Sequence, residues 1–206
     1  MIGRDIALAL DTGARVLFQH VSSAQSVALI RAGKAMGAKI YAEVTPHHLS
    51  LTEDDVPAHG TYARMNPPLR KEADRQALIA ALADGTIDMI ATDHAPHSAE
   101  EKSRGLEKSA MGVVGLETAF PVLYTALVKK NVISLARLVE LMSVTPRRRF
   151  GIPSDPGFCL FDVGEEYEIC PDDFLSRGRS TPFAGMRVLG KCIATVYGGK
   201  TVWQSK

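Results

Sequence analysis

Residues 15–45, RVLFQHVSSAQSVALIRAGKAMGAKIYAEVT, decide the fold class of this chain. They begin and end with short apolar runs, Arg15–His20 and Lys39–Thr45, whose size and composition are typical of buried parallel strands. Between the two runs, residues 23–36 space their apolar side chains as one face of a helix does, and Gly37 suits the end of that helix. A strand, a helix and a strand in this order predict two parallel strands of one sheet.

The same pattern continues once more along the chain. Residues 71–84 repeat apolar side chains at near-helical spacing, and Gly85 suits the end of this second helix. A third apolar run follows at Ile87–Thr92. The sequence therefore predicts a parallel sheet of at least three strands with helices between them.

Further helices and then strands are expected in the second half of the chain. A helix is expected over residues 116–129, and Ser134 is a candidate N-cap for the next one. Thr145-Pro146 is typical of a cap followed by a proline at the first helical position. Farther on, Gly, Pro and Asp become frequent and the apolar runs shorten. We therefore predict an α/β part over residues 1–151 and a β-rich appendage over residues 152–206.

The composition is that of an ordinary globular chain and excludes several classes of protein. Of the 206 residues, 46% are apolar and 23% are charged, and the formal net charge is +1. This charge argues against an electrostatic nucleic-acid-binding surface, and no apolar run reaches the roughly 18 residues of a membrane span. The first residues lack the pattern of a signal peptide. Three scattered cysteines, Cys159, Cys170 and Cys192, offer neither a disulfide framework nor a CxxC metal pair, so we expect a cytoplasmic protein.

Ionisable residues follow the ends of all three predicted strands. His20 closes the first run, Glu43 lies in the second run just before His47-His48, and Asp93 follows the third. In a parallel α/β fold, the carboxyl ends of the strands carry the chemistry. Position alone leaves two interpretations of His20 open, because a strand-end histidine is more often a structural residue than a metal ligand. Asp93, with histidines one and four residues later, is the stronger candidate for a metal or general-base site.

Two loops add candidate binding groups. Residues 66–70, NPPLR, form a rigid segment, because the prolines fix the backbone and hold the Asn66 amide in a defined place. Residues 105–115 form a loop punctuated by glycines, whose backbone N–H groups could hold an anion or a carbonyl oxygen. Each loop also has a purely structural interpretation, as a stiff turn and as an ordinary connector.

Together these segments resemble the C-terminal portion of the dihydroorotase branch of the cyclic amidohydrolases, of the type I-like kind within the amidohydrolase superfamily. Each segment is weakly specific alone, but their order and spacing over about 140 residues match the family. The segments that carry the resemblance are HVSS (20–23), AEVTPHHL (42–49), MNPPLR (65–70), ATDHAPH (91–97), GLET (115–118) and TPR (145–147), with TPF (181–183) resembling the tail.

The resemblance implies roles for six residues. His20 matches the histidine at the end of barrel strand six that binds the second metal. Asp93 matches the strand-eight aspartate that binds the first metal and serves as the general base. The remaining four match positions that contact the substrate: Asn66 and His97 through their side chains, and Met111 and Gly112 through the loop backbone that holds the pyrimidine-like ring.

The resemblance leaves other polar residues without a role. Glu43 matches a position that binds an extra metal only in some members, and we do not assign it. His47, His48 and His94 match no metal ligand. The family varies at the position of Met111, so its side chain is not expected to be essential.

The fold implied is α/β: the C-terminal part of a TIM-type (β/α)8 metal-dependent hydrolase barrel, with about three parallel strands and their helices, plus a small β-rich appendage. The implied chemistry is the reversible cyclisation of N-carbamoyl-L-aspartate to (S)-dihydroorotate in pyrimidine synthesis, with two Zn²⁺ ions per site. In the family, a His-x-His pair, a bridging carboxylate or carboxylated lysine, and a further histidine come from earlier strands. No His-x-His precedes His20 here. Two ligands cannot close a tetrahedral site, and a full barrel usually needs about 250 residues.

Three hypotheses follow. The chain is part of a working dihydroorotase, truncated or complemented by a second chain that carries the earlier strands, and it is inactive or nearly so when isolated. Alternatively, it is a non-catalytic scaffold subunit for a partner such as aspartate transcarbamoylase. The third hypothesis is a sister cyclic amidase, a hydantoinase or an allantoinase. The substrate would be a small molecule in the first and third cases, and a homo-oligomer is a further option.

Overall fold

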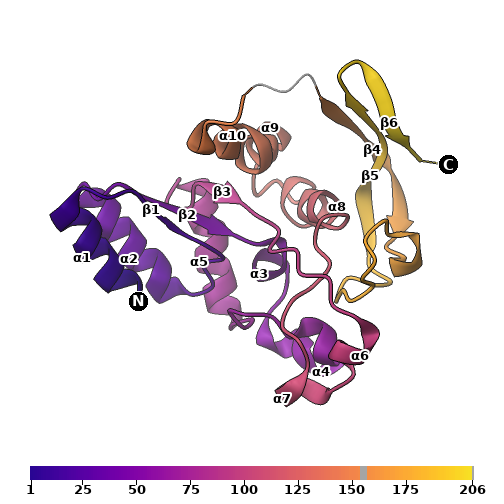
Figure 1. Cartoon of the computed structure of the whole chain (residues 1–206), viewed down its shortest axis with the longest axis horizontal. Coiled ribbons are helices and arrows are strands. Elements are labelled where there is room, and N and C mark those ends of the chain that lie inside the picture. The colour runs from indigo at the N-terminus through magenta and orange to yellow at the C-terminus, as the bar shows by residue number, and fades with distance from the viewer. Residues whose placement is uncertain (154–156, 206) are drawn as a thin grey trace.

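A three-stranded parallel sheet organises the first half of the computed structural model, which describes residues 1–153 and 157–205. Its strands are β1 (Val16–Phe18), β2 (Ile40–Val44) and β3 (Met89–Ile90), in the order β1-β2-β3. Both pairings are parallel, which confirms the predicted sheet. Figure 1 shows this sheet beside α1 and α2 at one end of the molecule and an antiparallel sheet at the other end.

The two predicted helices between the strands are present as α2 (Ala24–Ala35) and α5 (Glu72–Ala83). Ser23 caps α2, because its side chain accepts a hydrogen bond from the Ser26 N–H at 3.2 Å. The two helices pack against each other, and their inward faces join the main hydrophobic core. Side-chain periodicity alone was therefore enough to place these helices on the sheet.

The first helix, α1 (Ile2–Thr12), was not among the predicted elements. It buries Ile6 against α2 and β2, and Gly33 of α2 makes this approach possible. A Cβ at Gly33 would meet side-chain carbons of Ile6 and Ile40 at 2.9 Å. The close packing of α1 therefore depends on the absence of a side chain at Gly33. The helix itself has local signals, because Ile2, Ile6 and Ala9 recur at helical spacing and Gly13 ends it with φ +71°.

The later helices form two longer helical runs. The first joins α8 (Ala119–Leu123) to a π-helical turn at Tyr124–Val128. The second runs through α9 (Leu135–Val139), a π-helical turn at Glu140–Val144 and α10 (Thr145–Phe150). The predicted helix over 116–129 is thus present in shortened form, and Ser134 is the predicted N-cap, accepting from the Arg137 N–H at 3.1 Å.

The predicted cap at Thr145 was wrong. Thr145 has helical backbone angles, φ −65° and ψ −46°, because the preceding π-helical turn leads directly into α10. Pro146, which has no N–H to donate, comes two residues after this π-helical turn and so lies inside the continuous helical run. Because the helical run continues through Thr145, this residue does not cap the start of a helix.

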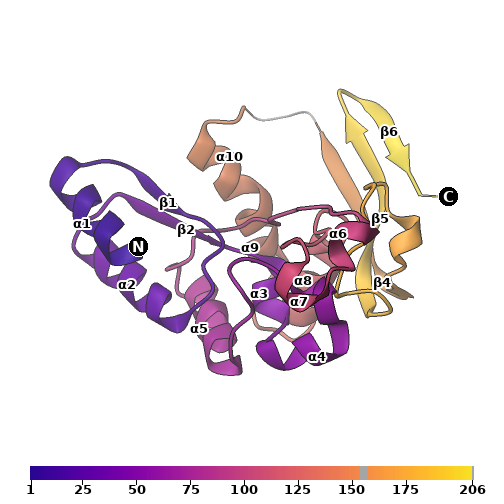
Figure 2. The same ribbon diagram turned by 60° about the horizontal axis from the view of Figure 1, so that its bottom comes forward.

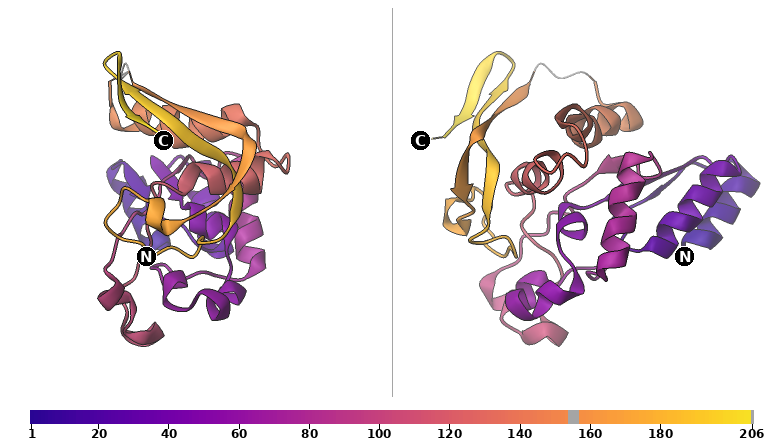
Figure 3. Two further views of the ribbon diagram at one scale, coloured as in Figure 1. Left: turned by 90° about the vertical axis from the view of Figure 1, so that its right-hand side faces the viewer. Right: turned by 180° about the vertical axis from the view of Figure 1, so that it is seen from behind.

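The β-rich tail is a three-stranded antiparallel sheet of β4 (Phe158–Glu168), β5 (Arg187–Tyr197) and β6 (Lys200–Gln204). It forms the long twisted ribbon seen from two sides in Figure 3. The ribbon packs on α8: the rings of Phe120 and Phe161 stack at 4.0 Å, and the Leu189 N–H donates to Thr125 Oγ1 at 2.9 Å. A Cβ at Gly190 would lie 2.9 Å from the Phe120 ring. The β-rich texture is confirmed, whereas the proposed division into 1–151 and 152–206 stays a prediction; residues 154–156 and 206 lie outside the described part.

Short helical segments occupy the loops on one side of the sheet. Figure 2 shows α4, α6 and α7 grouped together in this region. In the described residues, no helix combines the length and apolar character needed to cross a membrane. These segments are α3 (Pro46–Ser50), η1 (Glu53–Asp55), α4 (Val56–His59), η2 (Gly60–Ala63), α6 (Ala99–Lys102) and α7 (Gly105–Lys108). A further short segment, η5 (Pro171–Asp173), lies between β4 and β5 of the tail.

His48, in the short helix α3, fixes the loop after η2. Its Nδ1 lies 2.7 Å from Thr45 Oγ1 and its Nε2 lies 3.0 Å from the Pro67 carbonyl oxygen. The carbonyl can only accept, so Nε2 carries the proton and Nδ1 accepts from the Thr45 hydroxyl. The neutral ring is then fully satisfied. Burial lowers the pKa of His48 to about 4.

We predict that the chain loses stability as the pH falls from 6.5 to about 4. In this window an unfolded His48 binds a proton that the folded, buried ring does not, so protons favour the unfolded state by up to roughly 3 kcal/mol. His47, also buried and with a lowered pKa, acts in the same direction. Urea unfolding across this range should show the loss, and His48→Gln should make the dependence shallower. An equal slope in both proteins would contradict this role of His48.

Candidate active site

The carboxyl ends of the three parallel strands bring the two predicted metal ligands to the same edge of the sheet. His20 follows β1 and Asp93 follows β3, so the two residues flank the central strand β2. Two backbone hydrogen bonds extend the pairing here. The Val21 N–H donates to the Glu43 carbonyl oxygen at 2.9 Å, and the Ala91 N–H donates to the Val44 carbonyl oxygen at 3.1 Å. The backbone around both candidate ligands is therefore fixed to β2.

Both candidate ligands have a left-handed backbone. The φ angle is +40° at His20 and +49° at Asp93, and Asn131 is the one other non-glycine residue with positive φ in the described residues. Such a conformation costs an L-residue on the order of 1 kcal/mol, and it is commonly found where function requires a side chain to be aimed. Two equivalent outliers, one after β1 and one after β3 on either side of β2, therefore mark this edge as a candidate site.

Glu43 lies buried in β2, between the two strand ends. Burial raises the pKa of its carboxyl group, the negative charge of Asp93 adds to this rise, and the charge of His20 opposes it. Glu43 therefore lies within electrostatic reach of both candidate ligands. Glu43, to which the sequence assigned no role, is therefore part of the surroundings of the candidate site.

The residues present fit a cation, although they do not complete its coordination. His20 Nδ1 is buried and has no hydrogen-bond partner within the described part of the chain, which is unusual for an imidazole nitrogen. The Asp93 carboxylate is exposed at the same edge. Imidazole and carboxylate are ordinary zinc ligands. Within residues 1–153 and 157–205, however, no group of three or more His, Cys, Asp or Glu side chains is arranged to hold a metal.

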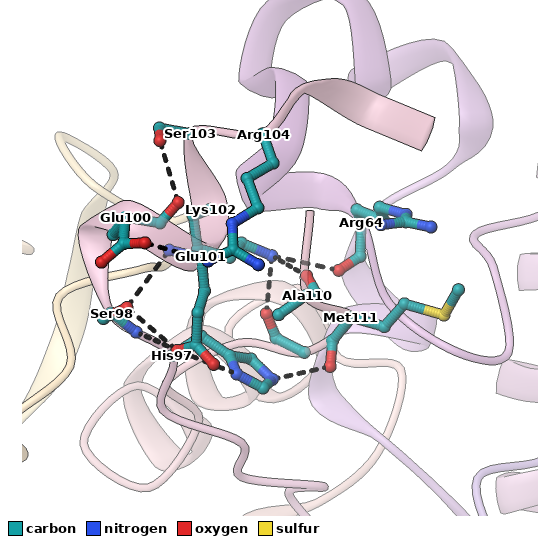
Figure 4. A network of polar contacts seen from close by, with 11 residues as sticks. Arg64, His97, Ser98, Glu100, Glu101, Lys102, Ser103, Arg104, Ala110 and Met111 are labelled. Atoms are coloured by element: carbon teal, nitrogen blue, oxygen red, sulfur yellow. Dashed lines mark hydrogen bonds and ion pairs between the residues drawn. The ribbon is translucent and has the colours of Figure 1, made fainter. Parts of the chain in front are cut away.

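Three of the predicted substrate contacts converge beside this edge, as Figure 4 shows in part. His97 Nε2 lies 2.9 Å from the Met111 carbonyl oxygen. Gly112 follows with φ +139°, and a Cβ there would lie 2.5 Å from Ala95 Cβ and 3.2 Å from His97 Nε2. Only glycine fits this approach. The loop 110–112 and the segment that carries Asp93 and His97 are therefore packed together.

The loop backbone is partly occupied by internal hydrogen bonds. The Gly112 N–H donates to the Arg64 carbonyl oxygen at 3.0 Å, and the Met111 oxygen faces His97. The Met111 N–H makes no hydrogen bond among the described residues, so it is the donor of the pair that remains open to a ligand. The side chain of Met111 is 48% exposed and fixes nothing in the site.

Asn66 is brought near this loop through its neighbours. Arg64, two residues earlier, accepts the Gly112 bond, and His48 holds the carbonyl of Pro67, the residue after Asn66. The Asn66 side chain is exposed and makes no hydrogen bond within the part of the chain that the structure describes. Its amide is thus free to meet a ligand, on a backbone anchored from both sides.

Two other histidines lie close to the site. His94 Nδ1 accepts from the N–H groups of Gly115 and Leu116 at 3.1 and 3.3 Å. This nitrogen therefore holds the loop in place and is not open to a metal ion. His47 is 2% exposed, and its Nε2 has no partner among the described residues. The sequence analysis missed Lys102, a buried lysine behind the 110–112 loop. Nothing in its local sequence distinguishes it from a surface lysine.

Known proteins resemble this chain along nearly its whole length. The sequence profile of the amidohydrolase family matches residues 9–202. Dihydroorotases from Bacillus cereus (strain AH820) and Bacillus anthracis (strain CDC 684 / NRRL 3495) are each 48% identical to it over 212 residues. These matches cover 100% of this chain and 50% of each relative, so the chain spans about half the length of the curated relatives it matches.

Solved structures show the same partial coverage. The L-hydantoinase (dihydropyrimidinase) of Arthrobacter aurescens superposes with a TM-score of 0.92 at 32% identity, covering 98% of this chain and 48% of that one. The dihydropyrimidinase of Brevibacillus agri NCHU1002 gives 0.91 at 27% identity with the same coverage. The parallel sheet with its helices is thus the C-terminal part of a TIM-type hydrolase barrel, followed by its β-rich appendage. On the match over residues 9–202, the chain belongs to the amidohydrolase family.

Proposed function

We propose that this chain carries the catalytic C-terminal part of a dihydroorotase, which interconverts N-carbamoyl-L-aspartate and dihydroorotate. The observation that carries the proposal is the placement of Asp93 and His20, both with left-handed backbones, on either side of β2. The 48% identity to dihydroorotases along the whole chain supports this choice of substrate.

In the proposed hydrolysis, Asp93 is the general base. Its carboxylate takes a proton from the attacking water and delivers it to the ring nitrogen as the C–N bond of the cyclic amide breaks. The reverse sequence closes the ring and releases water. Asp93 is exposed at the sheet edge, which leaves its carboxylate accessible to both water and substrate.

Other residues of the chain would orient the substrate. The Asn66 amide, the His97 ring and the Met111 N–H can each hold a polar group of the ring, and fixing the ring in place lowers the entropic part of the barrier. Two Zn²⁺ ions, held in part by His20 and Asp93, would supply Lewis acidity at the amide carbonyl. The buried Nδ1 of His20, which has no hydrogen-bond partner among residues 1–153 and 157–205, supports a cation in this region.

Hydantoinase activity is a second candidate, because the hydantoinase of Arthrobacter aurescens has the same fold with a TM-score of 0.92. Its 32% identity is lower than the 48% of the dihydroorotases, so we favour dihydroorotate as the substrate. A scaffold role beside a partner such as aspartate transcarbamoylase would need no aimed carboxylate. The costly backbone of Asp93 therefore favours a catalytic chain.

We predict that the pure 206-residue chain with added Zn²⁺ has little or no dihydroorotate hydrolysis. Two ligands do not close a tetrahedral site, and no larger ligand group is present in the described residues. Mixing the chain with the separately produced first half of the Bacillus anthracis dihydroorotase should restore turnover. Substantial activity of the chain alone would refute this prediction. Turnover of hydantoin rather than dihydroorotate by the mixture would favour the second candidate.

In that complemented mixture, Asp93→Asn should lower kcat by about 10²–10⁴-fold, because it removes the general base while keeping a similar shape. Asp54→Asn, at an exposed carboxylate of η1, is the matched control and should leave kcat unchanged. Near-normal kcat for Asp93→Asn would exclude Asp93 as the base. Zn²⁺ content measured on both variants separates a lost base from a lost metal.

A further inference from the structure

Lys102 is a buried lysine that no step of the proposed chemistry uses. It ends the short helix α6, and its side chain is among the largest fully buried ones, at 1% exposure. Lysine is rarely buried to this extent without a charged partner. Among the described residues, no carboxylate lies within ion-pair distance of its ammonium group.

Three backbone carbonyls surround the ammonium group instead. Lys102 Nζ donates to the oxygens of Arg64 at 3.3 Å, Ala110 at 3.0 Å and Gly112 at 3.0 Å. Figure 4 shows these bonds converging on one nitrogen. An ammonium group has three N–H donors and no acceptor, so this arrangement uses its full donor capacity.

The burial of Lys102 has a cost. Desolvation, together with the nearby Arg64 guanidinium, lowers the pKa of Lys102 to about 8. A methionine or leucine would fill the same space without losing hydration. What an apolar residue cannot do is bind three carbonyl oxygens that come from two separate loops. The property that distinguishes lysine here is therefore its ability to hold those two loops together.

The loops joined by Lys102 are the ones that carry the expected substrate contacts. The first runs from Arg64 to Asn66, and the second from Ala110 to Gly112. The Arg64 oxygen accepts from both Lys102 Nζ and the Gly112 N–H, so it is the point where the two loops meet.

Helix α6 provides a rigid base for these contacts. Ser98 and Glu101 form a reciprocal capping box, with the Glu101 N–H donating to Ser98 Oγ at 3.1 Å and the Ser98 N–H donating to the Glu101 carboxylate at 2.9 Å. From this short segment, hydrogen bonds reach the three consecutive residues 110–112. The Glu101 backbone carbonyl accepts from the Ala110 N–H, and the His97 ring contacts the Met111 carbonyl oxygen. Lys102 Nζ donates to the carbonyl oxygens of Ala110 and Gly112.

We propose that Lys102 is a positioning residue of the substrate site, whose ammonium group joins the 64–66 and 110–112 loops and so sets the place of Asn66 and the Met111 N–H. This inference rests on the proposed function, because it takes both loops as parts of the substrate site. Lys102 itself touches no substrate. Its effect on the reaction passes through the two loops.

The first test follows the loops directly in the 206-residue chain, by amide hydrogen exchange of the wild type, Lys102→Met and Lys102→Gln. The Gly112 amide, which donates to Arg64, should exchange at least about tenfold faster in both variants. Exchange in β4 and β5 should be unchanged. Lys108→Met, at an exposed lysine of α7, is the matched control and should behave as the wild type.

Two results of this test would overturn the proposal. One is an unchanged rate at Gly112 in folded Lys102→Met. The other is faster exchange throughout β4 and β5 in both Lys102 variants, which would make Lys102 a residue of the global fold and not of the loops. Because exchange needs no turnover, this test stands even if the proposed function fails.

The second test uses the complemented mixture and separates KM from kcat. A residue needed only for folding lowers the active fraction, which lowers the apparent kcat and leaves KM unchanged. A positioning residue for the substrate loops should raise KM for dihydroorotate about tenfold in Lys102→Met. An unchanged KM would overturn the proposal. Absence of turnover with the wild-type chain would instead count against the proposed function.

Discussion

The parallel pairing of β2 with both of its neighbours is the constraint on which the rest of the structure depends. It places the ends of β1 and β3 on the two sides of one central strand. Bonds from the Val21 and Ala91 N–H groups to β2 continue this pairing around His20 and before Asp93. The left-handed backbones of these two residues can persist only because the flanking segments are held in this way. The hydrogen bonds of the sheet thus offset the conformational cost of these two backbones.

A second layer of interactions converts this edge into a shaped site. The loop that leaves β3 carries Asp93 and His97 and then forms α6. From α6, Lys102 reaches back to the loops that contain Asn66 and Met111, and His97 contacts the Met111 oxygen. One continuous segment therefore supplies the proposed base and also positions the groups that would hold the substrate.

The sequence predicted those features that depend on local pattern. The three strands, α2 and α5 follow from short apolar runs and helical spacing, and the Ser134 cap follows from residue type. The helix α1 was not predicted, although Ile2, Ile6 and Ala9 lie at helical spacing and Gly13 directly follows its last residue. Thr145 was misread because the π-helical turn before it is not visible as a pattern.

The candidate site was predictable to a similar degree. Strand ends indicated His20 and Asp93, but the roles of Asn66, His97, Met111 and Gly112 came from family resemblance. Lys102 could not be predicted, because its three carbonyl partners include residues 38 and 10 positions away along the chain. Which side chain holds a loop in place depends on contacts between residues far apart in the sequence, and a local pattern does not reveal these contacts.

On our proposal, His20 and Asp93 are two ligands of a metal site that the rest of a barrel completes. The most direct test is a crystal structure of the chain bound to the first half of the Bacillus anthracis dihydroorotase, with zinc located by its anomalous scattering. We expect zinc in direct contact with a His20 ring nitrogen and an Asp93 carboxylate oxygen. Zinc bound in the complex without contact to either residue would contradict it.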